Sequence, residues 1–211
     1  MEVAVINEDL MESNAMFMVA DAREYLYSTM EYHPCSSIHP IIWEDESMVS
    51  FGVFDITNSG DLSVTAPIAE VFMSFDPYGI EVYPNKLDCA DGMSEQQRYV
   101  VAINNIVDVV DEKQSKIITK TIKYDPEEHG YDVSIEDQVD VKRTRIIRLY
   151  LSEDKLKALP EAKRHIFRPE GTDTFFFSEE IYNALYKIAL EGKASGLTAY
   201  TFDIKEKAPK F

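Results

Sequence analysis

Three side chains that could bind a metal ion lie within seven residues of one another. His33, Cys35 and His39 form the pattern H-x-C-x3-H, and imidazole and thiolate groups are both ligands of zinc. Only these three candidates cluster, however, and their spacing matches no zinc-binding pattern. The surrounding residues 32–40 include two prolines and two serines, which interrupt regular structure. We therefore predict a loop without a bound metal, and no other cofactor.

A second group of side chains could support hydrolytic chemistry. Ser115 is a potential nucleophile, but no GxSxG context surrounds it. Asp111 is interpreted as a turn residue whose carboxylate binds nearby backbone N–H groups. His165 stands in the segment RHIFR and is interpreted as a structural histidine of a strand. Because no glycine-rich phosphate loop is present either, we predict that the chain is not an enzyme. A hydrolase that combines His165 with Asp111 or Ser115 is the alternative.

An acidic run adjoins the only tryptophan of the chain. Glu44, Asp45 and Glu46 follow Trp43 directly. Consecutive residues of a strand point to opposite faces, so these carboxylates would not converge on one substrate as general acid and base. The run is therefore interpreted as an exposed acidic surface. Trp43 itself is either a protein-binding anchor among acidic residues or a buried core residue.

The charge of the chain is large and unevenly placed. Its 211 residues include 38 acidic and 21 basic side chains, a formal net charge of −17. Residues 1–100 hold 18 acidic and three basic residues, a balance of −15. Such a field repels nucleic acid and anionic membranes and speeds encounter with a basic protein. We predict a basic protein partner and no direct binding to nucleic acid or membrane, unless the charge serves solubility alone.

The cysteine count and the start of the chain indicate a compartment. Two cysteines, Cys35 and Cys89, cannot form a disulfide framework, which fits a reducing environment. The first residues lack the basic region of a signal peptide, and the apolar run 15–20 is too short to span a bilayer. We predict a cytoplasmic protein, and the sequence leaves its oligomeric state open.

The hydrophobic pattern predicts many short strands and a few helices. Strands are expected over residues 3–6 (at a sheet edge), 41–43, 48–56, 80–87, 99–103, 106–110, 117–124, 143–151, 165–168, 174–177 and 197–202. Helices are expected over residues 20–30, after the capping residue Thr65, between Ser152 and Pro160, and after Ser178 with Gly192 at its end.

The order of these elements predicts the fold class. Strands precede and follow isolated helices without a regular βαβ alternation, which favours an α+β fold. We expect a mixed or antiparallel sheet with a few packed helices. The length suffices for one sizeable core, so residues 1–211 are predicted to form a single domain. An N-terminal subdomain over residues 1–64, or two lobes separated by the polar stretch 88–97, is left as an alternative.

Three segments together resemble a known family. The first is the extended stretch 80–87, which follows a helix. The second, residues 99–115, combines a tyrosine-led strand, an asparagine-centred break, an apolar run, an aspartate and a serine. The third runs from residues 166–168 through a turn to FFFSEE at 175–180, a helix, and a closing strand with Gly196 and Phe202. In order and spacing these segments resemble, over residues 65–203, family eleven of the bacterial immunity proteins of polymorphic toxin systems.

This resemblance implies a function without catalysis. Such a protein binds a cognate secreted or contact-delivered toxin in the cytoplasm and blocks it by steric occlusion. The matching residues belong to strands, turns and caps, so no catalytic residue is transferred. A hydrolase that reverses a toxin's modification, or a general acidic adaptor or nucleic-acid mimic, is the alternative. We expect the acidic first half to contact the toxin through Trp43, Glu44, Asp45, Glu46, Asp55 and Asp61.

Overall fold

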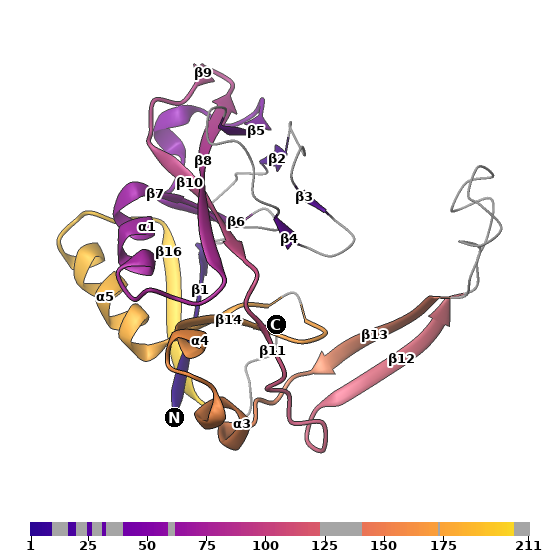
Figure 1. The fold of residues 1–211 in the computed structure, drawn as a ribbon. Coiled ribbons are helices and arrows are strands. Elements are labelled where there is room, and N and C mark those ends of the chain that lie inside the picture. Colours follow the sequence, from indigo (N-terminus) through magenta and orange to yellow (C-terminus); the bar gives the residue numbers. More distant parts are fainter. Residues whose placement is uncertain are drawn as a thin grey trace.

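A five-stranded sheet forms one layer of the protein (Figure 1). The computed structural model describes residues 1–9, 17–19, 25–26, 31–32, 40–58, 62–122, 141–172 and 174–204. The sheet order is β11–β14–β15–β1–β16, in which only the β11–β14 pair is parallel. Its strands are β1 (Glu2–Glu8), β11 (Ile106–Val107), β14 (Ile166–Pro169), β15 (Phe176–Ser178) and β16 (Leu197–Asp203).

A second sheet has the order β2–β5–β8–β10–β7–β6, and β9 pairs with β8. Its strands are β2 (Met18–Val19), β5 (Ile41–Asp45), β6 (Ile56–Asn58), β7 (Leu62–Thr65), β8 (Ile80–Cys89), β9 (Gly92–Met93) and β10 (Arg98–Ile103). Strands β5 and β8 run parallel, whereas the other pairs are antiparallel. Together with the helices, these mixed sheets confirm the predicted α+β class.

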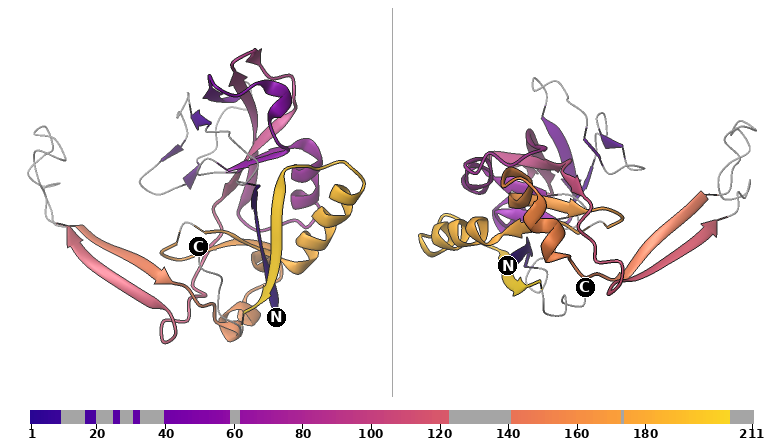
Figure 2. Two further views of the ribbon diagram at one scale, coloured as in Figure 1. Left: turned by 180° about the vertical axis from the view of Figure 1, so that it is seen from behind. Right: turned by 60° about the horizontal axis from the view of Figure 1, so that its bottom comes forward.

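Two smaller sheets and several helices complete the fold. The small sheets are β3 (Tyr25–Leu26) with β4 (Glu31–Tyr32), and β12 (Lys116–Ile122) with β13 (Val141–Arg148). The β12–β13 ribbon extends away from the rest of the protein (Figures 1 and 2). The helices are α1 (Ala66–Met73), α3 (Glu153–Ala158), α4 (Ala162–His165), α5 (Glu179–Leu190) and the 3-10 helix η1 (Ser50–Gly52). None of the helices described is both long and apolar enough to cross a membrane.

Local signals set the ends of the helices. The Ser178 hydroxyl accepts the Ile181 N–H at 3.4 Å and caps α5 as predicted. Gly192 follows this helix with a φ of +71°, a conformation that glycine adopts without steric cost. Ser152 caps α3 in the same way as Ser178 caps α5. Helix α1 begins after Thr65 as predicted, but the Thr65 side chain makes no capping bond.

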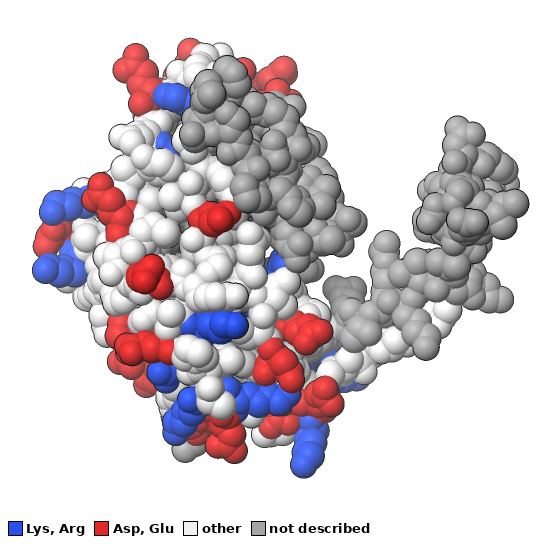
Figure 3. All heavy atoms as spheres, in the orientation of Figure 1, with Lys and Arg blue, Asp and Glu red and all other residues white. Residues whose placement is uncertain are grey.

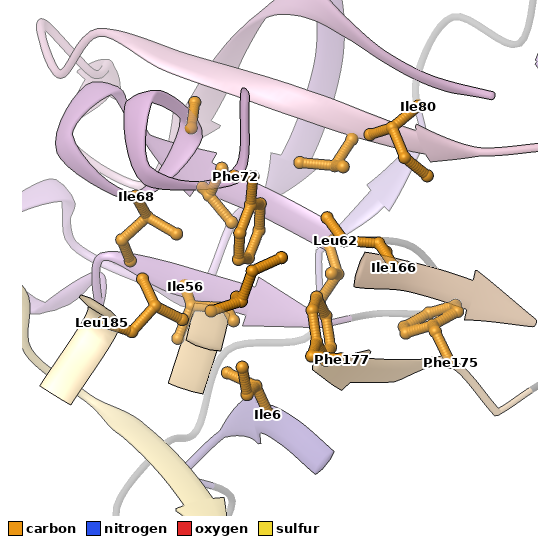
Figure 4. Close-up of a cluster of buried hydrophobic side chains, with 14 of the residues drawn as sticks. Ile6, Ile56, Leu62, Ile68, Phe72, Ile80, Ile166, Phe175, Phe177 and Leu185 are labelled. Atoms are coloured by element: carbon orange, nitrogen blue, oxygen red, sulfur yellow. The ribbon is translucent and has the colours of Figure 1, made fainter. Parts of the chain in front are cut away.

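The largest hydrophobic core lies between the two sheets and helices α1 and α5 (Figure 4). Phe72 of α1 stacks on Phe177 of β15 with ring centroids 5.3 Å apart. Leu185 of α5 and Ile6 of β1 are almost fully buried in the same cluster. Burying a side chain of this size contributes about 1.5–3 kcal/mol, so this cluster fixes the helices on the sheets.

Strand β1 has a hydrophobic core on each face. Ala4 and Ile6 belong to the core above, whereas Val3 and Val5 belong to a second cluster with Phe167 and Phe176. A strand buried on both faces has a continuous apolar sequence, which explains the run from residue 3 to residue 6. The strand prediction is confirmed, but the predicted edge position is wrong, because β15 and β16 flank β1.

Other local predictions are corrected by long-range pairing. The helix expected over residues 20–30 is wrong where this region is described, because Tyr25–Leu26 pairs with Glu31–Tyr32 as β3 and β4. The strand expected over residues 48–56 is replaced by a turn, the 3-10 helix and only the start of β6. His165 ends α4 instead of starting a strand. The candidate metal ligands His33, Cys35 and His39 lie outside the described residues.

Candidate functional site

The structure places Trp43 in the interior. Its side chain is 1% exposed and packs in a third hydrophobic cluster, which includes Leu87 and Val100 on the other face of the second sheet. Of the two interpretations of this tryptophan, the structure therefore favours the core residue. The neighbouring Glu44 and Glu46 are exposed. Glu44 lies on the solvent side of β5, as the alternation of a strand predicts, and Glu46 lies in the turn that follows.

Asp45 and Asp55 are engaged in bonds within the chain. Asp45 is buried, and its Oδ1 atom accepts the backbone N–H and the hydroxyl of Ser47, at 2.9 and 2.6 Å. Asp55 accepts the backbone N–H and the hydroxyl of Ser195 on Oδ2, at 2.8 and 2.7 Å. Asp45 thus closes a turn, and Asp55 joins the segment before β6 to the segment before β16. Asp61 lies outside the described residues.

Parallel pairing of β5 with β8 gathers acidic residues that are distant in sequence. Glu44 pairs with Asp88 in the register of these strands, and β9 folds back so that Asp88 also pairs with Met93. We call residues 44–52 and 88–95 the acidic tip. These residues include no lysine or arginine. Figure 3 shows acidic side chains at the end of the protein where Figure 1 shows β9. The acids of the tip are Glu44, Asp45, Glu46, Asp88, Asp91 and Glu95.

One carboxylate fixes the shape of the tip. Asp91 accepts the backbone N–H of Ser50 on Oδ1 and the Ser50 hydroxyl on Oδ2, each at 2.8 Å. The Ala90 N–H also donates to the Met48 carbonyl at 2.8 Å. The bonds from Ser50 hold the pKa of the Asp91 carboxyl below its ordinary value. The 3-10 helix is therefore bound to the β8–β9 turn before any partner arrives.

The tip exposes apolar side chains among its acids. Phe51 of the 3-10 helix is 91% exposed, and Met93 of β9 is 49% exposed. Exposed aromatic side chains are the common anchors of protein interfaces. Sequence reasoning missed Phe51, because a strand over residues 48–56 would have been a buried part of the sheet. The glycine after Phe51 was the available signal for a break in that strand.

The electrostatics of the tip are set by its carboxylates and by nearby bases. Burial raises the pKa of the Cys89 thiol, and the carboxylates of Asp91, Asp45 and Asp88 raise it further, in that order. The three carboxylates thus all lie close enough to the buried Cys89 sulfur to disfavour its thiolate form. Lys86 is the base that precedes the tip on β8, and its ammonium donates to the Ser94 carbonyl at 3.3 Å. The tip can attract cationic groups and offers an aromatic contact beside them.

The residues considered for hydrolysis have other partners. The Asp111 carboxylate accepts the N–H groups of Lys113 and Gln114, at 3.0 and 3.1 Å, as expected for a turn residue. The Ser115 hydroxyl accepts the Tyr150 N–H at 2.9 Å. His165 is buried, and its Nδ1 atom lies 3.1 Å from the Oγ atom of the helix cap Ser178. Asp111 and Ser115 belong to one turn, in which the Ser115 N–H donates to the Asp111 carbonyl at 2.8 Å, whereas His165 ends α4. All three side chains thus have structural roles.

One comparison places the chain in a known family. The model of the immunity protein family Imm11 matches residues 50–202, which is more than half of the chain. The match includes the residues on which the resemblance was recognised in the sequence. It also includes the second segment of the tip, residues 88–95, whereas residues 44–49 precede it. No curated protein matches the chain.

Proposed function

Because this chain belongs to the Imm11 immunity protein family, we propose that it binds and neutralises a cognate bacterial toxin. The toxin is one that a secretion system or cell contact delivers, and the chain meets it in the cytoplasm. Inhibition is steric: the bound chain covers the toxin's active site and transforms no substrate itself. The surface of the toxin that meets the chain carries basic side chains.

The observation that carries this proposal is the exposed Phe51 within a tip of six carboxylates. Acidic charges accelerate the encounter with a basic partner, whereas a buried aromatic contact sets the lifetime of the complex. The bonds between Asp91 and Ser50 order the tip in advance, so binding loses less conformational entropy. Residues 44–49 precede the family match, and a partner-specific surface would extend beyond the shared region in this way. Of the predicted contacts that the structure describes, Glu44 and Glu46 are exposed.

Co-expression tests the proposal directly. The toxin encoded by the neighbouring gene is produced with and without this chain, and cell survival is measured. The purified proteins are then mixed and analysed by gel filtration. We expect survival only in the presence of the chain and co-elution of the two proteins. Continued killing together with separate elution would overturn the proposed function.

Charge reversal tests which surface binds. The variant E44K/E46K reverses two exposed acids of the tip, and the matched control E161K/E170K reverses two exposed acids elsewhere. We expect about a tenfold slower association for the tip variant at low salt, with a weaker dependence on salt, and no such change for the control. Equal association rates for the two variants would assign the toxin to another face.

A third variant distinguishes binding from hydrolysis. The substitutions His165→Gln and Asp111→Asn remove the side-chain chemistry that a reversing hydrolase would need, while a polar group stays at each position. We expect the folded double variant to protect cells as well as the original chain does. Complex formation with loss of protection would instead favour the hydrolase.

A further inference from the structure

The β12–β13 ribbon is a second charged surface, of the opposite sign. Its strands, KIITKTI and VKRTRIIR, contain six basic and no acidic residues. We call residues 116–122 and 141–148 the basic arm. The arm extends from the rest of the molecule in every view (Figures 1 and 2). At its base, Leu149 and Leu151 are buried in the second hydrophobic cluster, and Val110 forms a bridge with Leu151. The arm is thus attached firmly at this end.

The pairing of the arm places like charges opposite each other. Lys116 pairs with Arg148. Like charges directly opposite in an antiparallel pair are destabilising, and a two-stranded ribbon alone is only marginally stable in water. Within the described sheets, β12 and β13 pair only with each other. An acidic partner would relieve the repulsion between these residues.

The acidic tip is the complementary surface on the same chain. It contains six acidic and no basic residues, against six basic and no acidic residues in the arm. Each surface also exposes apolar side chains: Phe51 and Met93 on the tip, and Ile117 and Ile147 on the arm. In Figure 1, β9 of the tip and the β12–β13 ribbon lie at different ends of the protein. One chain therefore does not bring its own arm and tip together.

We propose that the basic arm of one copy docks on the acidic tip of a second copy. The contact is heterologous, so successive copies associate head to tail into a ring or an open chain. The net charge of −17 opposes association at long range, but charges are screened beyond about 8 Å at physiological salt. The local attraction between arm and tip then dominates. The toxin competes with this contact, because both use the tip.

The charges of the chain favour a second copy over a nucleic acid as the occupant of the arm. Residues 123–140, which connect the two strands, contain seven acidic residues and one lysine. The excess of acidic residues, both in this segment and in the chain as a whole, would repel a polyanion. A compact acidic surface, in contrast, can contact the two strands of the arm without contacting the segment that connects them.

Two complementary variants test the proposal with the full-length protein. The arm variant is K116E/K120E/R148E and the tip variant is E44K/E46K/E95K, and each change brings the charge of its surface to zero. The double variant K113E/K187E reverses two exposed bases outside the arm and serves as the control. Sedimentation velocity is measured over a concentration series at about 50 mM and about 500 mM salt, where screening differs strongly. Circular dichroism checks that each variant is folded.

We expect the original chain and the control to exceed the monomer mass of 24.1 kDa at least twofold at low salt, and to dissociate at high salt. Each three-site variant alone should be monomeric. An equimolar mixture of the two three-site variants should form a dimer. The arm variant still has an intact tip, and the tip variant still has an intact arm that can dock on it. Monomers for the original chain at low salt, or for the mixture, would overturn the proposal. If that original chain is monomeric and only the arm variant fails to bind the toxin, the arm contacts the toxin instead.

Discussion

Ser50 and Asp91 are 41 residues apart in the sequence, yet both carboxylate oxygens of Asp91 bind Ser50 at 2.8 Å. One bond comes from the backbone N–H and the other from the hydroxyl, so the carboxylate fixes both the backbone position and the side-chain rotamer of Ser50. This pair holds the 3-10 helix, and with it Phe51, against the β8–β9 turn. The proposed toxin contact thus rests on a bond that no local pattern of the sequence contains.

The bond between Ser50 and Asp91 should open in acid. The pKa of Asp91 is lowered because its charged form accepts two bonds from Ser50. A carboxylate of this kind stabilises the fold above its unfolded pKa, about 3.9, and the contribution is lost as the pH falls through the folded pKa. In an NMR titration, the Ser50 amide and the Asp91 carboxyl should shift with one midpoint below about 3.9. Replacement by Asn should abolish the amide transition, and its persistence would contradict the assignment.

Phe51 should matter for binding and not for folding. Because the side chain is 91% exposed, Phe51→Ala should leave the thermal midpoint of unfolding unchanged. The toxin should bind at least about tenfold more weakly, a loss of about 1.4 kcal/mol or more. The control is Leu190→Ala, which truncates a side chain that is 72% exposed at the end of α5. Titration calorimetry measures the affinity of each variant for the toxin. An equal loss of affinity in Phe51→Ala and Leu190→Ala would show that Phe51 is not an anchor of the interface.

Two glycines with similar backbone conformations should differ in their tolerance of a methyl group. Gly192 and Gly196 have φ values of +71° and +68°. A Cβ atom at Gly192 meets nothing within 4 Å, whereas one at Gly196 would overlap the Phe54 side chain. In urea denaturation, Gly192→Ala should cost about 1 kcal/mol for its left-handed conformation. Gly196→Ala should cost about 3 kcal/mol or more, and similar losses would show that Phe54 moves freely.

The buried Arg98 should be among the most sensitive polar positions. Burial lowers the pKa of its guanidinium to about 10, so the group remains charged at neutral pH. It donates to the carbonyl oxygens of Phe54 and Ser63 at 2.7 and 2.9 Å. Arg98→Met removes both bonds, and although the Thr57 hydroxyl still donates to the Ser63 carbonyl at 3.4 Å, the change should lower the free energy of unfolding by about 3 kcal/mol. The exposed Arg148→Met should cost less than about 0.5 kcal/mol, and urea denaturation compares the two.

Elements with a local cause could be predicted from the sequence. The cap Ser178, the acidic first turn after it and Gly192 together predict α5 at its observed ends. The buried strand β10 follows from its β-branched run, since such residues suit a sheet that is covered on both faces. Hydrogen bonds and rotamer preferences within a few residues decide these elements. The resemblance to an immunity protein family also depends on such segments, and the family match confirms it.

The candidate site depended on contacts that a linear pattern does not contain. The exposed acids Glu44 and Glu46 were found by their charge, but Asp88 joins them only because β5 pairs with β8. The sequence left open whether Trp43 was exposed, and packing against Leu87 decided it. Phe51 was missed because an apolar run can be a strand or an exposed turn.

By itself, the sequence determined the acidic balance, the helix caps, the buried strands and the family. Each of these depends on residue type or on neighbours within a few positions. The tertiary structure decided which acids share a surface, which aromatic side chain faces solvent and where the basic arm lies. These features result from the competition of distant segments for burial and strand pairing, whose outcome depends on the whole chain at once.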